Sequence, residues 1–131
     1  MRLNQVTLRA TDLARSVSFY KLLGLRLIVD ALPRYVRFEV PSDNQTLSLE
    51  QVESPPASDG AVIYFECDDL DERVKALKQK GLVFDSGPRD ESWLWREARL
   101  KDPDGNEICL YHAGSNRRFP PWRVKEGDDP H

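Results

Sequence analysis

The sequence contains few residues of the kinds that build disulfides or strong metal sites. Its 131 residues include two cysteines, Cys67 and Cys109, and two histidines, His112 and His131. The cysteines lack Cys-x-x-Cys spacing and fall in segments expected to be strands, so we expect reduced, partly buried thiols rather than a disulfide. The net charge is only −3, with 22 acidic and 19 basic residues mixed along the chain. No basic face therefore predicts binding to nucleic acid.

Long hydrophobic runs are missing as well. The apolar stretches span only a few residues, and the opening MRLNQVTLRA lacks the apolar core of a signal peptide. We therefore expect a cytoplasmic protein with no membrane partner. The composition that is present, 40% hydrophobic and 31% charged, excludes wholesale disorder and suits one globular domain.

The chain contains an internal repeat. Residues 5–25 and 62–82 align without a gap at an offset of 57 positions. In each copy an alternating strand leads into an Asp-Leu step, which predicts a helix capped by Asp12 or Asp69. In the second copy Glu72 follows three residues after the aspartate, as in a capping box.

The pattern after each predicted helix is that of strands. Gly24 and Gly81 are expected to end the helices, because glycine adopts the left-handed conformation at low cost. Alternating segments then predict strands at 25–30, 35–40, 46–52, 82–85, 94–101 and 107–112. The segments PSDNQ and DPDGN are expected to form hairpin turns.

These elements predict an α+β fold of two βαβββ modules, whose curved, mixed sheet forms a cup with the helices on its outer face. We expect a single domain over 1–131, made of module one (1–53), a linker (54–60), module two (61–113) and a C-terminal tail (114–131).

Alternation along the strands gives the sheet two different faces. The apolar set is expected under the helices: Val6, Leu8, Val36, Phe38, Val40, Leu47, Leu49, Ile63, Phe65, Ala98, Leu100, Ile108 and Leu110. The opposite set is polar and aromatic, and we expect it to line a pocket for a small molecule. A simply solvated face is the alternative. The candidate ligand-binding residues are Gln5, Thr7, Arg9, Tyr35, Arg37, Ser48, Val62, Tyr64, Trp95, Arg99, Cys109 and Tyr111.

Particular residue types on this face indicate particular chemistry. The arginines suit a carboxylate or phosphate through forked hydrogen bonds. Pairing with glutamates across the strands is the alternative for each of them. The aromatic side chains suit a flat ligand. Glu50 and Glu66 are candidate general bases, provided that desolvation raises the pKa of the carboxyl group.

The segments MRLNQVTLRATDLARSVSFYKLLGLRL and DPDGNEICLYH resemble the vicinal oxygen chelate superfamily. That superfamily includes glyoxalase I, extradiol dioxygenases, fosfomycin-resistance thiol transferases and bleomycin-resistance proteins. The resemblance extends to about His112. It implies two βαβββ modules forming a cup, often completed by dimerisation, so a homodimer is expected as one option. It leaves the reaction open, because the superfamily includes several chemistries as well as simple binders.

The resemblance also implies where a divalent metal would be held. Enzymes of the superfamily bind one between four inward residues, usually His or Glu, on the first and last strands of each module. The matching positions here are Gln5, Ser48, Val62 and Cys109, and valine cannot coordinate a metal.

We therefore expect a small-molecule binding protein of this superfamily without a metal or other cofactor. The alternative is a metal-dependent lyase, dioxygenase or thiol transferase with a non-standard centre. A further alternative is a dimeric interaction module whose cup is filled by its own tail. The run RRFPPWR around Trp122 is expected to form a lid or a dimer clasp, and a surface strap with solvated arginines is the alternative.

Overall fold

A computed structural model of the protein describes residues 1–41, 43–55 and 61–125. The elements in chain order are β1 (Gln5–Ala10), α1 (Leu13–Leu23), β2 (Arg26–Ala31), β3 (Tyr35–Glu39), β4 (Thr46–Gln51), β5 (Val62–Glu66), α2 (Leu70–Gln79), β6 (Phe84–Asp90), β7 (Arg96–Lys101), β8 (Glu107–His112) and a short 3-10 turn (Gly114–Asn116). Most of the predicted linker, 56–60, and the end of the predicted tail with His131 lie outside the described residues.

The strands form two four-stranded sheets, in the orders β1-β4-β3-β2 and β5-β8-β7-β6. The first strand of each sheet pairs with the last in parallel, and the other neighbours are antiparallel, so both sheets are mixed. The predicted α+β fold of two βαβββ modules is confirmed.

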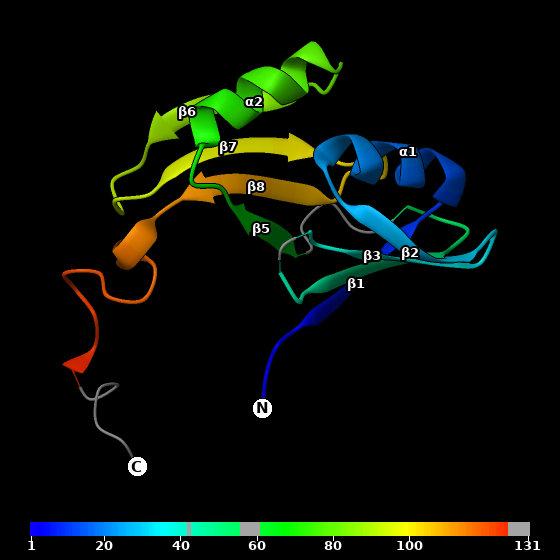
Figure 1. Ribbon diagram of the computed structural model, residues 1–131, viewed down its shortest axis with the longest axis horizontal. Helices are drawn as coiled ribbons and strands as arrows, with labels where there is room; N and C mark the ends of the chain where they lie inside the picture. The colour runs from blue at the N-terminus through cyan, green and yellow to red at the C-terminus, as the bar shows by residue number, and fades with distance from the viewer. Residues whose placement is uncertain (42, 56–60, 126–131) are drawn as a thin grey trace.

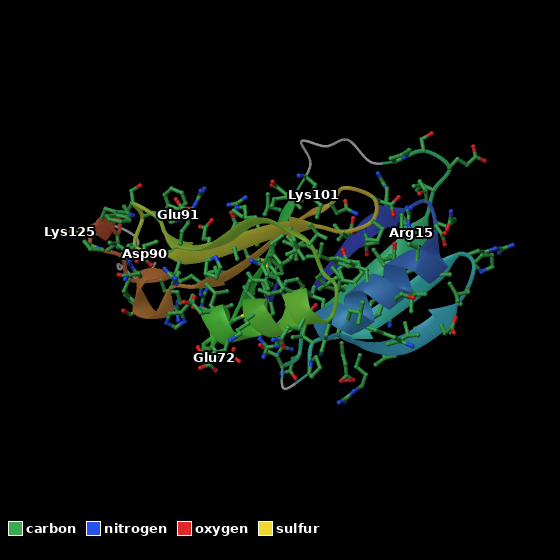
Figure 2. All side chains as sticks on the ribbon, turned by 90° about the horizontal axis from the view of Figure 1, so that it is seen from above. Arg15, Glu72, Asp90, Glu91, Lys101 and Lys125 are labelled. Carbon is green, nitrogen blue, oxygen red and sulfur yellow. The ribbon has the colours of Figure 1, made fainter. Side chains whose placement is uncertain are left out.

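Both helices lie on the same side of the sheets (Figure 1). Figure 2 shows the molecule from above, the side on which the helices lie in Figure 1, with the side chains drawn as sticks. The sheet surface away from the helices is called the open face below. No helix in the described part of the chain is long and apolar enough to cross a membrane.

The hydrophobic core lies between the helices and the sheets. Every residue of the predicted apolar set belongs to this core or packs against it. Phe38, Leu49, Leu100 and Ile108 have no exposed surface, and burial of each such side chain is worth about 1.5–3 kcal/mol. The predicted separation of the two sheet faces is therefore confirmed.

The two helices begin differently. The Asp12 side chain accepts a hydrogen bond from the Arg15 amide at 3.2 Å, which confirms the first predicted cap. Asp69 makes no capping hydrogen bond, and its carboxylate instead accepts from Arg73 Nε at 3.3 Å. The predicted capping box of Asp69 and Glu72 is therefore wrong, because an arginine one helical turn further on binds the same carboxylate.

The helix ends agree with prediction, whereas one strand does not. Gly24 and Gly81 have φ angles of 119° and 101°, in the left-handed region. β6 begins at Phe84 and runs to Asp90, although a strand was predicted at 82–85. Pro88 removes a donor from the ladder, which argues against a strand, but β6 lies at the sheet edge, where proline is tolerated. Its pairing with β7 is also irregular on both sides of Ser86.

One turn of module two is anchored in module one. The DPDGN turn between β7 and β8 places the Asp104 carboxylate 2.9 Å from the Thr11 amide and 2.6 Å from the Thr11 hydroxyl. The Tyr20 hydroxyl of α1 donates to Asp102 at 2.6 Å. Within the described residues no strand of one sheet pairs with a strand of the other. These side-chain contacts therefore help to set how the two open faces meet.

Candidate functional site

A cavity of about 530 Å³ lies between the start of β1 and β5, where the two modules meet. We call it the seam cavity. Its wall includes side chains of the open face from both modules and one from the tail: Gln5, Thr46, Val62, Tyr64, Glu66, Tyr111 and Arg117. The structure thus brings together Gln5, Val62, Tyr64 and Tyr111 among the predicted ligand-binding residues. The other predicted residues lie along the sheets on either side of the cavity.

An aromatic cluster of Tyr64, Trp95 and Tyr111 adjoins the seam cavity. Trp95 and Tyr111 are stacked, with ring centroids 4.6 Å apart and an angle of 18° between the planes. Tyr64 packs edge-on against both rings, at 5.9 Å and 5.6 Å. Tyr64 is 45% exposed whereas Tyr111 is 6% exposed, so Tyr64 presents the accessible ring of the cluster. A flat group entering the cavity would meet Tyr64 first.

Two of the three candidate arginines are already paired with carboxylates. Arg9 Nε lies 3.1 Å from Glu50 on the neighbouring strand. Arg99 lies 3.1 Å from Glu97 and 3.5 Å from Glu107. For both arginines the structure matches the alternative of pairing across or along strands. Glu50 is also not desolvated, because its side chain is half-exposed and forms the ion pair with Arg9. The burial that its expected role as a general base required is therefore not found.

The third arginine lies in a row of hydroxyl groups. The register places Thr7, Ser48 and Arg37 side by side on β1, β4 and β3. The Thr7 and Ser48 hydroxyls are 2.6 Å apart, and Arg37 Nε donates to the Tyr35 hydroxyl at 3.0 Å.

Glu66 holds the start of the tail. One of its carboxylate oxygens accepts hydrogen bonds from the amides of Ala113 and Gly114, each at 2.9 Å. Desolvation acts to raise the pKa of Glu66, but these two hydrogen bonds, with the charge of Arg117, bring it below its ordinary value. A general base at Glu66 was expected only if its pKa were raised. The pKa is lowered instead, because the amides stabilise the ionised form, so the raised pKa was a wrong expectation.

The rest of the tail stays near the surface. Trp95 Nε1 donates to the Asn116 carbonyl at 3.4 Å, and Arg117 lines the seam cavity. Trp122, expected in a lid or clasp, is 57% exposed.

Cys109 is buried in the floor of the open face. It has no exposed surface, and desolvation, followed by the nearby Glu97 carboxylate, raises the pKa of its thiol to about 12. Cys67 is also a free, buried cysteine, and burial raises the pKa of its thiol. Because the thiolate is the form that binds metals and attacks electrophiles, neither cysteine is prepared for either role.

The four positions that the resemblance links to a divalent metal do not provide a suitable donor set. The Gln5 side-chain oxygen accepts from the Thr46 hydroxyl at 2.8 Å, and the Ser48 hydroxyl is bonded to Thr7. Val62 has no donor atom and Cys109 holds a protonated thiol. In the part of the chain that the structure describes, no group of three His, Cys, Asp or Glu side chains could hold a metal ion. The residues present do not fit the superfamily's metal.

Sequence reasoning missed some of the cavity wall. Thr46 was on the polar face of its strand but was not selected, and strand alternation alone could have found it. Arg117 follows the last strand in a segment without periodicity, so no pattern indicated it. Leu3 and Asn4 precede β1 and also line the cavity, again without a signal in the sequence.

Comparison with known proteins identifies relatives of this chain by sequence. The sequence profile of the Glyoxalase/Bleomycin resistance protein/Dioxygenase superfamily matches residues 2–110. An uncharacterized protein, YraH, of Bacillus subtilis (strain 168) is 29% identical over 126 residues, which cover 85% of this chain and 98% of YraH.

Solved structures share the fold at lower identity. A glyoxalase/bleomycin resistance protein/dioxygenase from Nocardioides has a TM-score of 0.76 and 22% identity, covering 95% of this chain and 89% of its own. A bleomycin-binding protein complexed with bleomycin has a TM-score of 0.70 and 21% identity, and the match covers 86% of this chain and 98% of that protein. Lactoylglutathione lyase from Agrobacterium tumefaciens has a TM-score of 0.70 and 20% identity, and the match covers 85% of this chain and 92% of the lyase.

Proposed function

Since this chain belongs to the Glyoxalase/Bleomycin resistance protein/Dioxygenase superfamily, we propose that it binds a small molecule with a flat apolar group in the seam cavity. In this proposal protein side chains hold the ligand, and no divalent metal takes part. The observation that carries it is the half-exposed Tyr64 ring in the wall of a cavity of about 530 Å³. Ligand pockets typically have volumes of about 300–1,000 Å³ and combine apolar walls with a few polar groups.

The cavity wall supports such a ligand in two ways. Val62 and the Tyr64 ring provide apolar contact, and Gln5 and Thr46 provide hydrogen-bonding groups at the opposite wall. The bleomycin-binding protein, which shares the fold, carries its ligand in the solved complex. The absence of a metal is proposed from the chemistry of Gln5, Ser48, Val62 and Cys109.

The proposal is tested with N-phenylnaphthylamine, a neutral aromatic probe whose fluorescence rises in apolar surroundings. The wild-type protein should bind it saturably, and Tyr64→Ala should weaken binding about tenfold, because an aromatic contact and its buried area are lost. Trp122→Ala removes an exposed aromatic residue away from the cavity and serves as the matched control. Binding should be the same with and without a chelator.

Three results would overturn the proposal. One is the absence of saturable binding, and another is an equal loss of affinity in Tyr64→Ala and Trp122→Ala. A probe affinity that disappears with chelator and returns with a divalent ion would refute the metal-free part.

A further inference from the structure

The charges on the open face of module one do not cancel. Its ion pairs are Arg9 with Glu50 at 3.1 Å and Arg26 with Glu39 at 3.9 Å. Arg37 belongs to no ion pair among the described residues, although it lies between these two pairs on the central strand β3. Both carboxylates of this face, Glu39 and Glu50, are therefore paired, and within the described part of the chain the Arg37 guanidinium has no ion-pair partner.

The cationic side chains on the open face of module two are already paired. Arg99 lies 3.1 Å from Glu97 and 3.5 Å from Glu107, and Lys101 lies 3.0 Å from Asp85. An anionic ligand group is therefore favoured beside Arg37.

The hydrogen bonds around Arg37 leave suitable donors unused. Arg37 Nε donates to the Tyr35 hydroxyl at 3.0 Å, so the terminal guanidinium nitrogens lie close to that hydroxyl. The Arg37 guanidinium also lies over the Tyr35 ring, 5.5 Å from its centroid, which fixes its orientation. The terminal nitrogens make no hydrogen bond among the described residues.

A row of hydroxyl groups lies beside the same phenol. The Thr7 and Ser48 hydroxyls are 2.6 Å apart on the neighbouring strands β1 and β4. Interactions with Ser48 and with Arg37 lower the pKa of Tyr35 from its ordinary value. The Tyr35 oxygen accepts from Arg37 Nε, and a hydroxyl that accepts still carries a hydrogen that it can donate to a ligand.

We infer that Arg37 and the Tyr35 hydroxyl form an oxyanion site on the open face of module one. This site takes the carboxylate or phosphate group of the ligand whose apolar part enters the seam cavity, so the inference rests on the proposed function. A guanidinium fork and a phenol hydroxyl are strong donors to such groups.

The site is within reach of the cavity. Arg37, Ser48 and Thr7 follow one another across neighbouring strands, a span of about 10 Å at the usual strand spacing. Thr7 is two residues along β1 from Gln5, a rise of about 7 Å, and Gln5 lines the cavity. A ligand of ordinary small-molecule size can therefore contact both places.

A matched pair of probes separates this inference from the proposed function. Anilinonaphthalene sulfonate has the aromatic rings of N-phenylnaphthylamine plus one oxyanion group. The wild-type protein should bind the sulfonate about tenfold more tightly than the neutral probe. Arg37→Gln should remove this advantage and leave the affinity for the neutral probe unchanged, which also shows that the variant is folded. Arg89→Gln removes a paired arginine from the edge strand β6 of module two and should keep the advantage. Tyr35→Phe should lose part of it.

Competition then identifies the oxyanion. Phenyl phosphate and phenylacetate are added against the sulfonate probe, and the better competitor names the preferred group. The inference is overturned if neither competes, or if Arg37→Gln and Arg89→Gln reduce sulfonate binding equally. A neutral probe that fails to bind refutes the proposed function. A neutral probe that binds while the sulfonate gains nothing from Arg37 refutes the oxyanion site alone.

Discussion

The buried thiol of Cys109 shows how strongly surroundings control a single residue. A free thiol has a pKa of about 8.5 and is partly ionised near neutral pH. Cys109 has no exposed surface, and burial and Glu97 raise the pKa of its thiol to about 12. Both effects disfavour the thiolate, so Cys109 serves the open face as a small packed side chain.

This reasoning predicts that the native protein resists thiol alkylation. At neutral pH, iodoacetamide should modify Cys109 at least about a hundredfold more slowly in the folded protein than in denaturant, because both burial and thiolate content oppose the reaction. Mass spectrometry of digested samples measures the extent at each cysteine. Cys67, which is also buried, provides an internal comparison. Rapid modification of Cys109 in folded protein would show that the thiol is accessible and ionised.

The three arginines of the open face show what could be predicted at the residue scale. Strand alternation correctly placed Arg9, Arg37 and Arg99 on one face. It could not say which of them is unpaired, because ion pairing depends on register and side-chain conformation. Arg9 faces Glu50 across two parallel strands. Arg37 faces Ser48, which offers no charge.

At the scale of elements, Glu66 joins the end of β5 to the segment after β8. Its carboxylate accepts two amide hydrogen bonds at 2.9 Å and lies 3.8 Å from Arg117. These donors hold the pKa of Glu66 below its ordinary value of 4.5 in the folded protein. The stability that Glu66 contributes is therefore present above the ordinary pKa and is lost as the pH falls through the folded pKa.

We predict that Glu66→Ala loosens the start of the tail. Hydrogen-exchange protection of the Ala113 and Gly114 amides should fall about tenfold or more, because hydrogen bonds to a charged group are lost. Wild-type protection at these amides should approach that of the variant as the pH falls through the folded pKa of Glu66, which lies below its ordinary value of 4.5. Glu50→Ala removes a carboxylate from module one and should leave both amides protected. Protection that is independent of pH and of Glu66 would contradict this assignment.

Helices and strands with a clear hydrophobic periodicity were predicted well. Features that depend on which neighbouring group makes a contact, such as a cap or an edge strand, were not. Both helix starts follow an Asp-Leu step, but only Asp12 caps its helix, because Arg73 binds the carboxylate of Asp69. β6 has no clear alternation, since Gly87 and Pro88 lie inside it. β6 lies at the edge of its sheet, where a strand tolerates proline. The order of strands in the sheet decides this position, so the local sequence of β6 could not predict it.

At the scale of the whole molecule, the seam cavity depends on how the modules dock. The 57-residue repeat and the strand faces predicted a cup, but not where its lining residues would meet. Docking relies on contacts such as Asp104 with Thr11 and Asn106 with the Arg9 carbonyl, which join distant parts of the sequence. Such contacts have no periodicity, so the location of the cavity had to come from the structure.

The last prediction concerns this docking. The side chain of Asp104 is 1% exposed, accepts two hydrogen bonds from Thr11 and lies 3.5 Å from Arg15 of α1. Asp104→Ala should lower the free energy of unfolding by about 2 kcal/mol, because it leaves the partly buried donors of Thr11 without an acceptor. Asp43→Ala is the matched control, because Asp43 is an exposed residue in the corresponding turn of module one. Its effect should stay within about 0.5 kcal/mol. Urea denaturation followed by circular dichroism measures both variants. Equal stability of the two would mean that the turn of module two does not hold the modules together.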